Sequence, residues 1–319
     1  MSTLLITDNK IDLRINARLE EYTTFRLGGC SRGLIHCQTP EQLEYAVKQL
    51  SNQNLPFILI GGGSNLVVSD QGADCYVIRY VSETPDIKRE GFDVIVSGAT
   101  NLDTLALYSV EQGLEGLVYT SGIPGTVGGA VVGNAGAFGK QVGDVLKSAT
   151  LMDTKGNLKE VGPETLDFRY RHSNLKNRDE IVVSVRFGVG AGDKEKLMAE
   201  RLEILRTREE KHPNLKTHPC AGSFFRNVEP TSKAGRRQAA GWFLDQAGGK
   251  KLSCGGAVIF EKHANIIVKA DGCTAEDVFN LHLQMYDLVR RHFNIKLVRE
   301  VRFVGDFAGK PKELKGVIW

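Results

Sequence analysis

The sequence lacks several features that would place it directly in a class of protein. Its six cysteines include no CxxC pair, which excludes a disulfide framework and a zinc site of the usual spacing. The 41 basic and 38 acidic residues leave a net charge of only +3, which does not favour nucleic acid or an anionic membrane as a partner. No apolar run approaches the roughly 20 residues of a membrane span.

The sequence also shows little sign of targeting or linker segments, and we expect neither. The first residues, Met-Ser-Thr-Leu-Leu-Ile-Thr-Asp, have no basic region and no long apolar core, so we expect no signal peptide. The 319 residues contain no internal repeat and no Ser/Pro-rich linker. Such a length predicts two or three units. From these absences we expect a soluble, cytoplasmic protein whose partners are small molecules.

One group of possible metal ligands lies close together in the sequence. Cys30, His36 and Cys37 are of the right types, but the fourth ligand of a zinc site is missing. The alternative is that these cysteines are small buried side chains or free thiols. We predict no metal.

Two glycine-rich segments are the most informative feature that the sequence does contain. Gly61–Asn65 (Gly-Gly-Gly-Ser-Asn) follows the apolar run Phe57–Ile60, and a longer segment occupies residues 122–139. Dense glycine permits backbone conformations barred to other residues, or brings backbone close to a ligand. Free N–H groups in such a turn suit a phosphate or diphosphate. We therefore expect a large phosphorylated cofactor in the first half of the chain.

The pattern is not that of a Rossmann fold. Neither segment contains GxGxxG, and Gly61–Asn65 leads into the apolar stretch Leu-Val-Val rather than into a helix. A dinucleotide, if one is bound, is held by another fold.

Local patterns predict two units. Short β-rich runs predict strands at 57–60, 75–79, 94–96, 148–152 and 181–187, a hairpin turn at 153–157, and helices at 40–50 and 102–112, the latter ended by Gly113. The charged helical pattern at 193–211 suggests a boundary. Beyond it we predict helices at 239–247 and 274–292, the second opened by a Thr274–Asp277 capping box, and strands at 258–260, 265–268 and 298–305.

A series of motifs identifies a family resemblance. They are Thr23–Gly29, Gly61–Asn65, Gly122–Gly129, Asn134–Gly139, Phe168–Ser173, Ala221–Asn227, Ala240–Gln246, Glu261–Asn265 and Glu300–Gly305. Over residues 20–305 and in this order, they closely resemble the UDP-N-acetylenolpyruvoylglucosamine reductase (MurB) family. The chain resembles its shorter subtype, because there is no room between Arg171 and Ser223 for the substrate-capping insertion of the longer one.

This resemblance implies a fold and an activity. The fold would be α+β, with an FAD-binding domain of the p-cresol methylhydroxylase/vanillyl-alcohol oxidase type in two lobes and a C-terminal α+β substrate domain. We expect an N-terminal lead at 1–20, the FAD-binding domain at 21–190, the substrate domain at 191–305 and a basic, peripheral tail at 306–319. The activity would be NADPH-dependent reduction of the enolpyruvyl ether of UDP-N-acetylglucosamine to UDP-N-acetylmuramate through FAD, for peptidoglycan synthesis, by a monomer.

Three residues match the family's catalytic positions. Ser223 stands where the family has its proton donor, Arg171 matches the catalytic arginine that clamps a carboxylate, and Glu300 matches the acid that stabilises the developing enolate. That last role requires a raised pKa, which burial beside another carboxylate would supply. Each has a plainer interpretation: Ser223 as a turn or N-cap serine, Glu300 as a strand ion pair with Arg302, and Arg171 as one of several surface cations. Arg169 is the competing candidate if the alignment slips.

The remaining expected contacts also come from the resemblance. Asn227, Lys250, His263 and Lys211 are the substrate-contact candidates, although some family members carry a glutamine at the position of His263. The expected cofactor contacts are Gly61, Gly62, Gly63, Ser64, Asn65, Gly122, Ile123, Pro124, Gly125, Gly128, Gly129, Asn134, Ala135, Gly136 and Ala137. Tyr22 departs from the Asn that often precedes Thr-Thr-Phe-Arg.

Other functions are compatible with parts of this pattern. A flavoprotein oxidase of the same fold would not need Arg171, Ser223 and Glu300 together, because it has no carbanion to protonate. A flavin-binding module without catalysis would not need these residues either. A UDP-sugar-binding protein without redox chemistry would have no use for the two glycine-rich loops.

Overall fold

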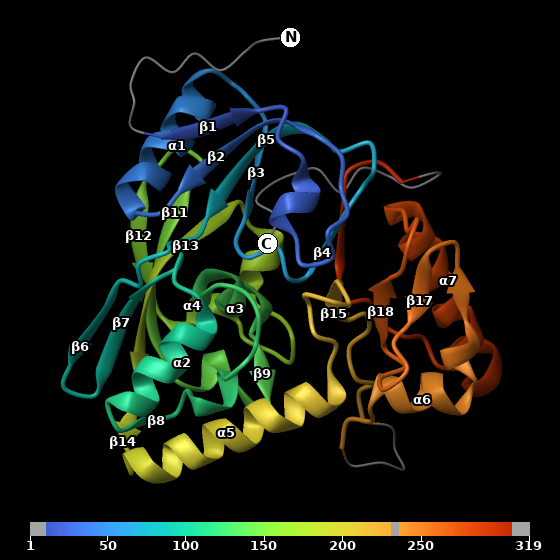
Figure 1. Cartoon of the computed structure of the whole chain (residues 1–319). Helices are drawn as coiled ribbons and strands as arrows, with labels where there is room; N and C mark the ends of the chain where they lie inside the picture. The colour runs from blue at the N-terminus through green and yellow to red at the C-terminus, as the bar shows by residue number, and fades with distance from the viewer. Residues whose placement is uncertain (1–10, 231–235, 308–319) are drawn as a thin grey trace.

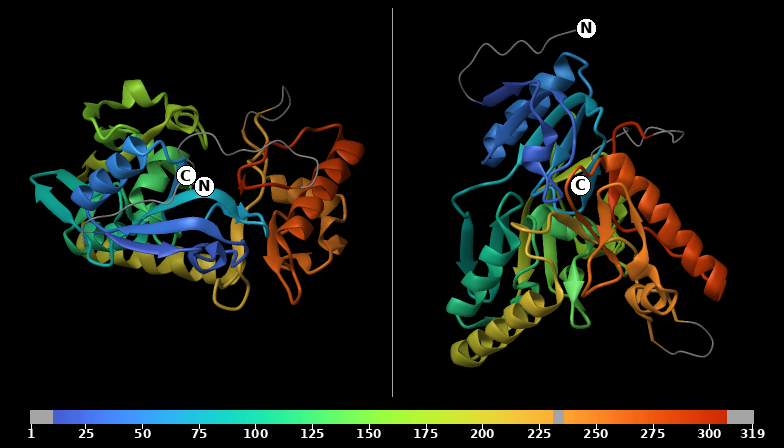
Figure 2. Two further views of the ribbon diagram at one scale, coloured as in Figure 1. Left: turned by 90° about the horizontal axis from the view of Figure 1, so that it is seen from above. Right: turned by 45° about the vertical axis from the view of Figure 1, so that its right-hand side comes forward.

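Three sheets of four or five strands, each with its own helices, form most of this computed structural model, which describes residues 11–230 and 236–307 (Figure 1). Two of the sheets belong to the N-terminal half of the chain and one to the C-terminal part. Seen from above, the C-terminal part lies beside the two N-terminal lobes rather than between them (Figure 2).

The first lobe is a sheet with the strand order β1-β2-β5-β3. Its strands are β1 (Asp12–Ile15), β2 (Ser31–Cys37), β5 (Ala73–Tyr80) and β3 (Phe57–Ile60), and β2 and β3 each pair with β5 in parallel. Helix α1 (Pro40–Asn52) begins where Thr39 Oγ1 accepts a hydrogen bond from the Gln42 N–H. It buries Leu43, Ala46, Val47 and Leu50, whose spacing of three and four residues places them on one face.

The second lobe is an antiparallel sheet with the order β12-β11-β13-β7-β6. The strands are β12 (Leu158–Val161), β11 (Leu146–Asp153), β13 (Glu180–Gly188), β7 (Asp93–Ser97) and β6 (Ile87–Glu90). Helices α2 (Leu102–Glu111) and α3 (Val127–Gly133) contribute to the core of this lobe. Sequence patterns did not predict α3, because three of its seven residues are glycine, a poor helix former.

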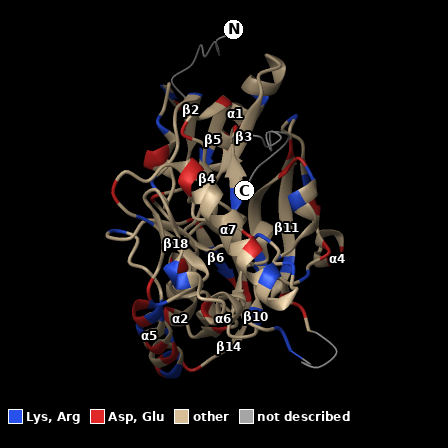
Figure 3. Ribbon diagram, turned by 90° about the vertical axis from the view of Figure 1, so that its right-hand side faces the viewer, with Lys and Arg blue, Asp and Glu red and all other residues tan. Residues whose placement is uncertain are grey.

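Helix α5 (Lys194–Lys211) runs along the base of the N-terminal half (Figure 1). Arg201, which is 7% exposed, forms two hydrogen bonds of 2.6 and 2.9 Å to the Asp103 carboxylate on α2. Basic and acidic residues are interspersed along α5 (Figure 3). Because α5 packs against the N-terminal half, we propose that the domain boundary follows it, near residue 212, and that the N-terminal unit already begins at β1.

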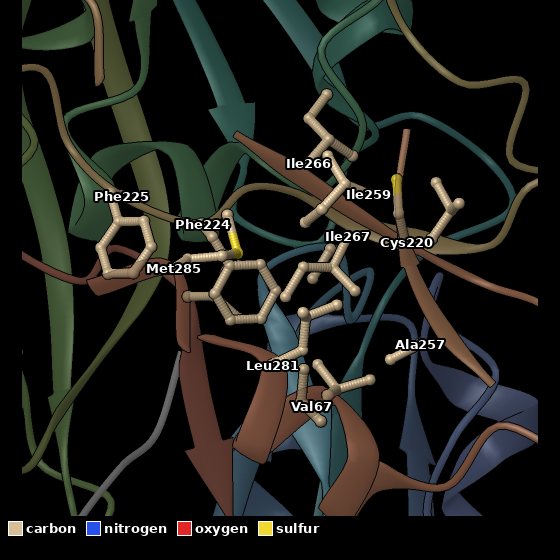
Figure 4. Close-up of a cluster of buried hydrophobic side chains, with 14 of the residues drawn as sticks. Val67, Cys220, Phe224, Phe225, Ala257, Ile259, Ile266, Ile267, Leu281 and Met285 are labelled. Atoms are coloured by element: carbon tan, nitrogen blue, oxygen red, sulfur yellow. The ribbon is translucent and has the colours of Figure 1, made fainter. Parts of the chain in front are cut away.

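The C-terminal unit is an antiparallel sheet covered by helices. Its strand order is β15 (Cys220–Ser223), β18 (Ile266–Lys269), β17 (Ala257–Ile259) and β16 (Ser253–Cys254), with α6 (Ala240–Gln246) and α7 (Ala275–Phe293). The predicted capping box opens α7, because Thr274 and Asp277 exchange side chain-to-backbone hydrogen bonds. Figure 4 shows Phe224, Leu281 and Met285 in the buried core between sheet and helix.

The end of the described chain returns to the N-terminal unit. Strand β19 (Arg302–Val304) pairs in parallel with β4 (Leu66–Val68), which follows the first glycine loop. The Asp70 carboxylate accepts hydrogen bonds from the Ala275 N–H at the start of α7. These contacts join segments more than 200 residues apart and set the position of one unit against the other.

The remaining short elements are connections. They are β8 (Leu114–Glu115), β9 (Gly136–Ala137), β10 (Lys140–Gln141), β14 (Gly190–Ala191), α4 (Pro163–Leu166) and the 3-10 turns η1 (Leu19–Tyr22), η2 (Val118–Thr120), η3 (Val142–Asp144), η4 (Asn174–Asn177) and η5 (Gly249–Lys251).

The strands, hairpin turn and helices predicted from local patterns are confirmed, with ends that differ by a few residues. The predicted strand at 298–305 is wrong in extent, because only Arg302–Val304 is regular strand. Strand β2 was not predicted, since Ser31, Arg32 and His36 interrupt its apolar pattern. Of the expected tail at 306–319, residues 308–319 lie outside the described chain, while Phe307 stacks on Phe279.

The early metal-site candidates have other surroundings. His36 Nε2 lies 3.1 Å from the Val81 carbonyl oxygen and 3.1 Å from Arg79 Nη1, and all six cysteines are free thiols. Across residues 11–230 and 236–307, no three His, Cys, Asp or Glu side chains are grouped to hold a metal ion. No helix in these ranges combines the length and the apolar character that crossing a bilayer requires.

Candidate active site

A cavity of about 810 Å³ lies between the two units and collects most of the predicted site residues. Its lining comes from both glycine-rich segments, from the last turn of α5, from β15 and from the segment that leads into β19. One side of the cavity is therefore formed by the main chain of Gly61–Asn65 and Gly122–Gly125, which we call the glycine wall. Another part of the lining carries Arg171, Ser223 and Glu300, and we call it the charged end.

The backbone wall forms where the two glycine-rich loops touch. A Cβ atom on Gly62 would lie 3.0 Å from the Gly125 Cα, and one on Gly61 would overlap Thr126 Oγ1. Gly63 has a φ of +62°, and a Cβ there would overlap the Tyr22 carbonyl oxygen. Side chains would thus separate the loops, so glycine is required by the close approach and by the left-handed backbone.

The wall fits the diphosphate of FAD by its chemistry. The N–H groups of Gly62, Gly63 and Ser64 donate to no protein acceptor within the described ranges, and these three residues line the cavity. The loop is held by the Ser64 hydroxyl, which donates to the Pro124 carbonyl oxygen at 2.9 Å. Free amides on a rigid, side-chain-free surface are suited to bind phosphate oxygens.

Two of the expected cofactor contacts do not reach this cavity. Asn134 is fully buried at the left-handed end of α3, where its Nδ2 donates to the Arg169 carbonyl oxygen and its Oδ1 accepts from the Gly143 N–H. The Gly128 N–H donates to the Gly98 carbonyl oxygen. The other expected contacts, which are Gly61–Asn65, Gly122–Gly125, Gly129 and Ala135–Ala137, all line the cavity.

Arg171 and Glu300 form the charged end of the cavity. Arg171 Nε lies 3.1 Å from Glu300 Oε1, and Arg171 Nη2 donates to the Gly136 carbonyl oxygen at 2.7 Å. The two side chains are 24% and 21% exposed. We expected a second carboxylate beside Glu300, but its neighbour in the structure is the Arg171 guanidinium. The charges of these two side chains neutralise each other until an anionic ligand enters the cavity.

The structure separates Arg171 from the neighbouring cations. Arg169, the competing candidate, has a side chain that is 71% exposed and paired with Asp167, and it does not line the cavity. Arg178 pairs with Glu180 on β13. Only Arg171 and Lys176 of this group of cations face the cavity.

Ser223 ends β15 and lines the same cavity. Its position is set by Asn265, which is 2% exposed. The Phe225 N–H donates to Asn265 Oδ1, Asn265 Nδ2 donates back to the Phe225 carbonyl oxygen, and the Phe224 N–H donates to the Asn265 backbone oxygen. Ser223 therefore caps no helix but stands at a strand end that a buried amide holds rigid.

Glu300 is placed by both units. Its N–H donates to the Phe224 carbonyl oxygen at 2.8 Å, one residue beyond Ser223. Its own carbonyl oxygen accepts from Asn65 Nδ2, and the Arg302 N–H donates to the Asn65 backbone oxygen. Side chains alternate along this segment, since Glu300 and Arg302 line the cavity while Val301 and Phe303 are buried.

Of the four substrate-contact candidates, only Lys211 lines the cavity. Lys250 pairs with Asp245, Asn227 Oδ1 accepts from the Ala240 N–H, and the His263 ring lies 5.7 Å from the His212 ring, centre to centre.

Sequence reasoning missed two other lining residues near Lys211, namely Arg208 and His212. Burial, with Arg208 and His263 nearby, lowers the pKa of His212 to about 4. Burial also lowers the pKa of Arg208, whose Nε donates to the Ser121 carbonyl oxygen. The signal available was the spacing at the end of a helix, because Arg208 lies three residues before Lys211 and four before His212, and positions three and four apart share a face.

Comparisons with known proteins agree with this arrangement. A family model described as "UDP-N-acetylenolpyruvoylglucosamine reductase, C-terminal domain" matches residues 212–304, and one described as "FAD binding domain" matches residues 31–162. The UDP-N-acetylenolpyruvoylglucosamine reductase of Carboxydothermus hydrogenoformans is 34% identical over 293 residues, covering 91% of this chain and 93% of that protein. That of Anoxybacillus flavithermus is 34% identical over 302 residues, covering 94% and 97%.

A solved structure shows the same relationship. The crystal structure of UDP-N-acetylenolpyruvylglucosamine reductase (MurB) from Thermus caldophilus matches with a TM-score of 0.75 and 31% identity, covering 92% of this chain and 98% of that one. Together these matches confirm the predicted fold class, an α+β protein with an FAD-binding domain of the p-cresol methylhydroxylase/vanillyl-alcohol oxidase type and a C-terminal domain.

Proposed function

The chain belongs to the UDP-N-acetylenolpyruvoylglucosamine reductase (MurB) family of FAD-dependent oxidoreductases in peptidoglycan synthesis, and from this premise we propose that its hydride donor is NADPH and its product UDP-N-acetylmuramate. The substrate is the enolpyruvyl ether of UDP-N-acetylglucosamine. All the residues that this reaction needs come from one chain, so we propose that the protein acts as a monomer in the cytoplasm.

One observation carries this proposal: Arg171, Ser223 and Glu300 line a single cavity that also contains the glycine wall. An oxidase of the same fold would need the wall but not these three side chains. These three residues come from segments far apart in the sequence and lie in one cavity. This arrangement supports an enzyme that binds a carboxylate and delivers a proton to the substrate.

FAD, when bound, would supply a two-electron carrier between the nicotinamide and the substrate. The N–H groups of Gly62, Gly63 and Ser64 would bind its diphosphate. The second loop would close this wall by contact rather than by donating, because the Gly122 and Ile123 N–H groups already donate to Asp103 and Thr120, and Pro124 has no N–H group. Ala135–Ala137 line the cavity between this wall and Arg171, where the ring end of the cofactor would fit.

At the charged end, Arg171 would bind the carboxylate of the enolpyruvyl group. A guanidinium can donate two parallel hydrogen bonds and keeps its charge, so it polarises the double bond and favours hydride addition at C3. The negative charge that develops at C2 and the carboxylate is then stabilised by a preorganised cation, an effect worth several kcal/mol.

Ser223 would donate its hydroxyl proton to C2. The new C–H bond takes the electron pair of the former double bond, and the serine recovers a proton from solvent. Glu300 would share the Arg171 guanidinium with the substrate carboxylate, and a proton taken up from solvent as the substrate binds, held between the two carboxylates, would stabilise the developing enolate. The cavity thus separates proton donation, by Ser223, from charge stabilisation, by Arg171 and Glu300.

The diphosphate of the substrate would lie near Lys211 and Arg208, two cations at the end of α5 that line the cavity. Asn227, Lys250 and His263 lie outside this lining, so we propose that they contact parts of the UDP-sugar that extend beyond it.

A stopped-flow flavin spectrum tests the proposal. The purified holoenzyme is mixed anaerobically with NADPH and then with the enolpyruvyl ether of UDP-N-acetylglucosamine. We expect bleaching of the oxidised-flavin band, followed by its recovery only with this substrate. Bleaching without recovery would remove the substrate from the proposal, and a colourless protein that takes up no FAD would overturn the assignment in favour of a UDP-sugar-binding protein.

A further inference from the structure

Lys176 lies at the charged end of the cavity, and none of the roles described above uses it. It belongs to the 3-10 turn η4 and lines the cavity together with Arg171 and Glu300. Among the described residues its ammonium pairs with no carboxylate, and it donates to the Arg171 backbone carbonyl oxygen at 2.8 Å. A cation in this place therefore contacts the main chain of the residue that carries the clamping guanidinium.

The backbone that Lys176 holds is strained. Arg171 is not glycine, yet its φ is +53°. It lies in a tight turn in which Arg169 and His172 each donate an N–H to the carbonyl oxygen of the other. Such a conformation is unfavourable for a residue with a side chain and persists only where the surroundings stabilise it.

Two side chains donate hydrogen bonds to carbonyl oxygens at the two ends of this turn. The Asn134 amide holds the Arg169 carbonyl oxygen at 2.8 Å, and Lys176 holds the Arg171 carbonyl oxygen. The first contact is neutral and fully buried, whereas the second comes from a cation at the cavity surface. A neutral donor would be enough to hold a carbonyl group, so the charge of Lys176 needs a separate explanation.

The surroundings of Lys176 carry an excess of positive charge. Among the described residues, the charged groups with the largest effects on it are the cations Arg226, Arg302 and Arg171 and the carboxylate of Glu300, and Lys176 also acts on His172. Burial, with Arg226 next in size, lowers the pKa of Lys176 to about 8, against the opposing effect of Glu300. A desolvated cation among other cations is costly unless an anion completes the group.

We propose that Lys176 is a positioning residue for Arg171, holding its left-handed backbone so that the guanidinium faces the substrate, and that its charge, added to that of Arg171, favours binding of the substrate carboxylate. This inference rests on the proposed function and deepens it. The anion that completes the group is the enolpyruvyl carboxylate.

Replacing Lys176 by Met tests the role directly. Misplacing a clamping group by about 1 Å can cost on the order of 10²-fold in rate, so we expect Lys176→Met to slow flavin reoxidation by the substrate about 10- to 100-fold. Flavin reduction by NADPH should stay within about threefold of the parent enzyme. Lys155→Met, the same change in the exposed hairpin turn after β11, is the matched control and should change neither step.

The Lys176→Arg variant and the pH dependence of kcat/KM distinguish a positioning role of Lys176 from a purely structural one. Because Lys176 loses its charge as the pH rises through about 8, kcat/KM for the substrate should fall in that range in the parent enzyme. Lys176→Arg keeps the charge, should recover at least a tenth of the lost rate, and should shift the alkaline fall to higher pH. In Lys176→Met this fall should be absent.

Three results would overturn the inference. They are substrate reduction at the parent rate in Lys176→Met, an equal loss in both half-reactions, or an alkaline fall that stays unchanged in both Lys176 variants. The flavin content and melting temperature of Lys176→Met, compared with those of Lys155→Met, show whether the variant has kept its fold. If it has not, the rates of Lys176→Arg and the pH profile of the parent enzyme test the inference instead. If the parent enzyme itself fails to reduce the substrate, the proposed function falls and this inference falls with it.

Discussion

The glycine wall and the charged end of one cavity are built in opposite ways. The wall, Gly61–Asn65 and Gly122–Gly125, works through its main chain, because its glycines let the two loops touch and the N–H groups of Gly62, Gly63 and Ser64 have no acceptor among the described residues. The charged end works through side chains, since Arg171, Ser223 and Glu300 each bring one group from a different segment. The glycine wall therefore determines which cofactor binds, whereas the charged end determines which reaction the substrate undergoes.

The two regions also differ in how far apart their parts lie in the sequence. Both loops of the wall belong to the N-terminal unit. The charged end joins the two units, and Asn65 connects it to the wall because its side chain and backbone hold Glu300 and Arg302. Changes in the charged end should therefore alter a rate, and changes in the wall should alter cofactor affinity.

The largest expected effect is that of Ser223→Ala. Removing the proton donor should slow flavin reoxidation by the substrate about 10²- to 10⁴-fold, because without protonation at C2 the hydride can return to the flavin. Flavin reduction by NADPH should be unchanged, because this half-reaction does not use the Ser223 proton. Stopped-flow measurement of the two half-reactions checks this. Ser253→Ala, at an exposed position of β16, is the control. An equal loss in both half-reactions would contradict the proton-donor role.

Glu300→Gln should also slow the half-reaction with the substrate and spare the one with NADPH, but the loss of rate should be smaller than for Ser223→Ala. We expect substrate reduction to slow on the order of 10²-fold, since the amide keeps the shape but cannot ion-pair with Arg171. Separate rates for the two half-reactions provide the measurement, and Glu261→Gln, an exposed position, provides the control. Normal turnover of Glu300→Gln would reduce Glu300 to a structural ion pair.

A change in the wall should affect binding instead. Gly63→Ala forces a side chain onto a φ of +62° and into the Tyr22 carbonyl oxygen, so we expect FAD affinity to fall at least about 10-fold. Turnover per bound flavin should stay within about threefold. Titration of FAD into the apoprotein, followed by flavin fluorescence, measures the affinity.

Gly91→Ala is a closely matched control for this change. Gly91 also has a φ of +62°, but a Cβ there would meet nothing within 4 Å. Both variants have the same backbone cost, and only Gly63→Ala adds the steric one. If Gly91→Ala lowered FAD affinity as much, the comparison between wall and charged end would fail, because the effect would reflect general stability.

The smallest expected effect concerns the support behind the wall. The Asp103 carboxylate accepts from the Gly122 N–H at 2.7 Å and pairs with the buried Arg201. Burial raises the pKa of Asp103, but hydrogen bonds from Arg201 and the Gly122 N–H outweigh it, so the pKa in the folded state lies below its usual value. The stabilisation is therefore complete above the ordinary pKa of about 4 and is lost as the pH falls through the lowered one.

Asp103→Asn should accordingly lower the melting temperature at pH 7 and lose this difference in acid. Because Asp103 is partly exposed, we expect about 1–3 kcal/mol, or roughly 2–8 °C. Thermal unfolding from pH 7 to pH 3 measures the effect, with Asp12→Asn in an exposed ion pair as the control. A difference that stays constant with pH would show that the Asp103 charge is not its cause.

Several features could be predicted from the sequence because they depend on neighbours along the chain. The capping box of Thr274 and Asp277, the end of α2 at Gly113 and the hairpin turn at 153–157 involve residues a few positions apart. The glycine-rich loops belong to the same group, since the lack of a side chain is a property of the residue itself. Strand β2 and helix α3 were missed because burial, rather than propensity, stabilises them.

The structure alone distinguished residues that look alike in the sequence. Arg169 and Arg171 are two positions apart, but the tight turn sends Arg169 to Asp167 and Arg171 to Glu300. Asn134 belongs to a glycine-rich motif, yet its amide is buried and holds that same turn. The direction of a side chain at a turn depends on the backbone and on its packing partners, which one sequence does not specify.

The sequence by itself determined the family, most of the regular elements and the residue types available for the chemistry, because those depend on local order and composition. Only the tertiary structure decided that Ser223 and Glu300 share a cavity, through the Phe224 carbonyl oxygen and the parallel pairing of β19 with β4. It also brought Lys176 onto the backbone of Arg171. The physical reason is that these contacts join segments whose separation along the chain carries no local signal, and burial of both units' cores brings them together.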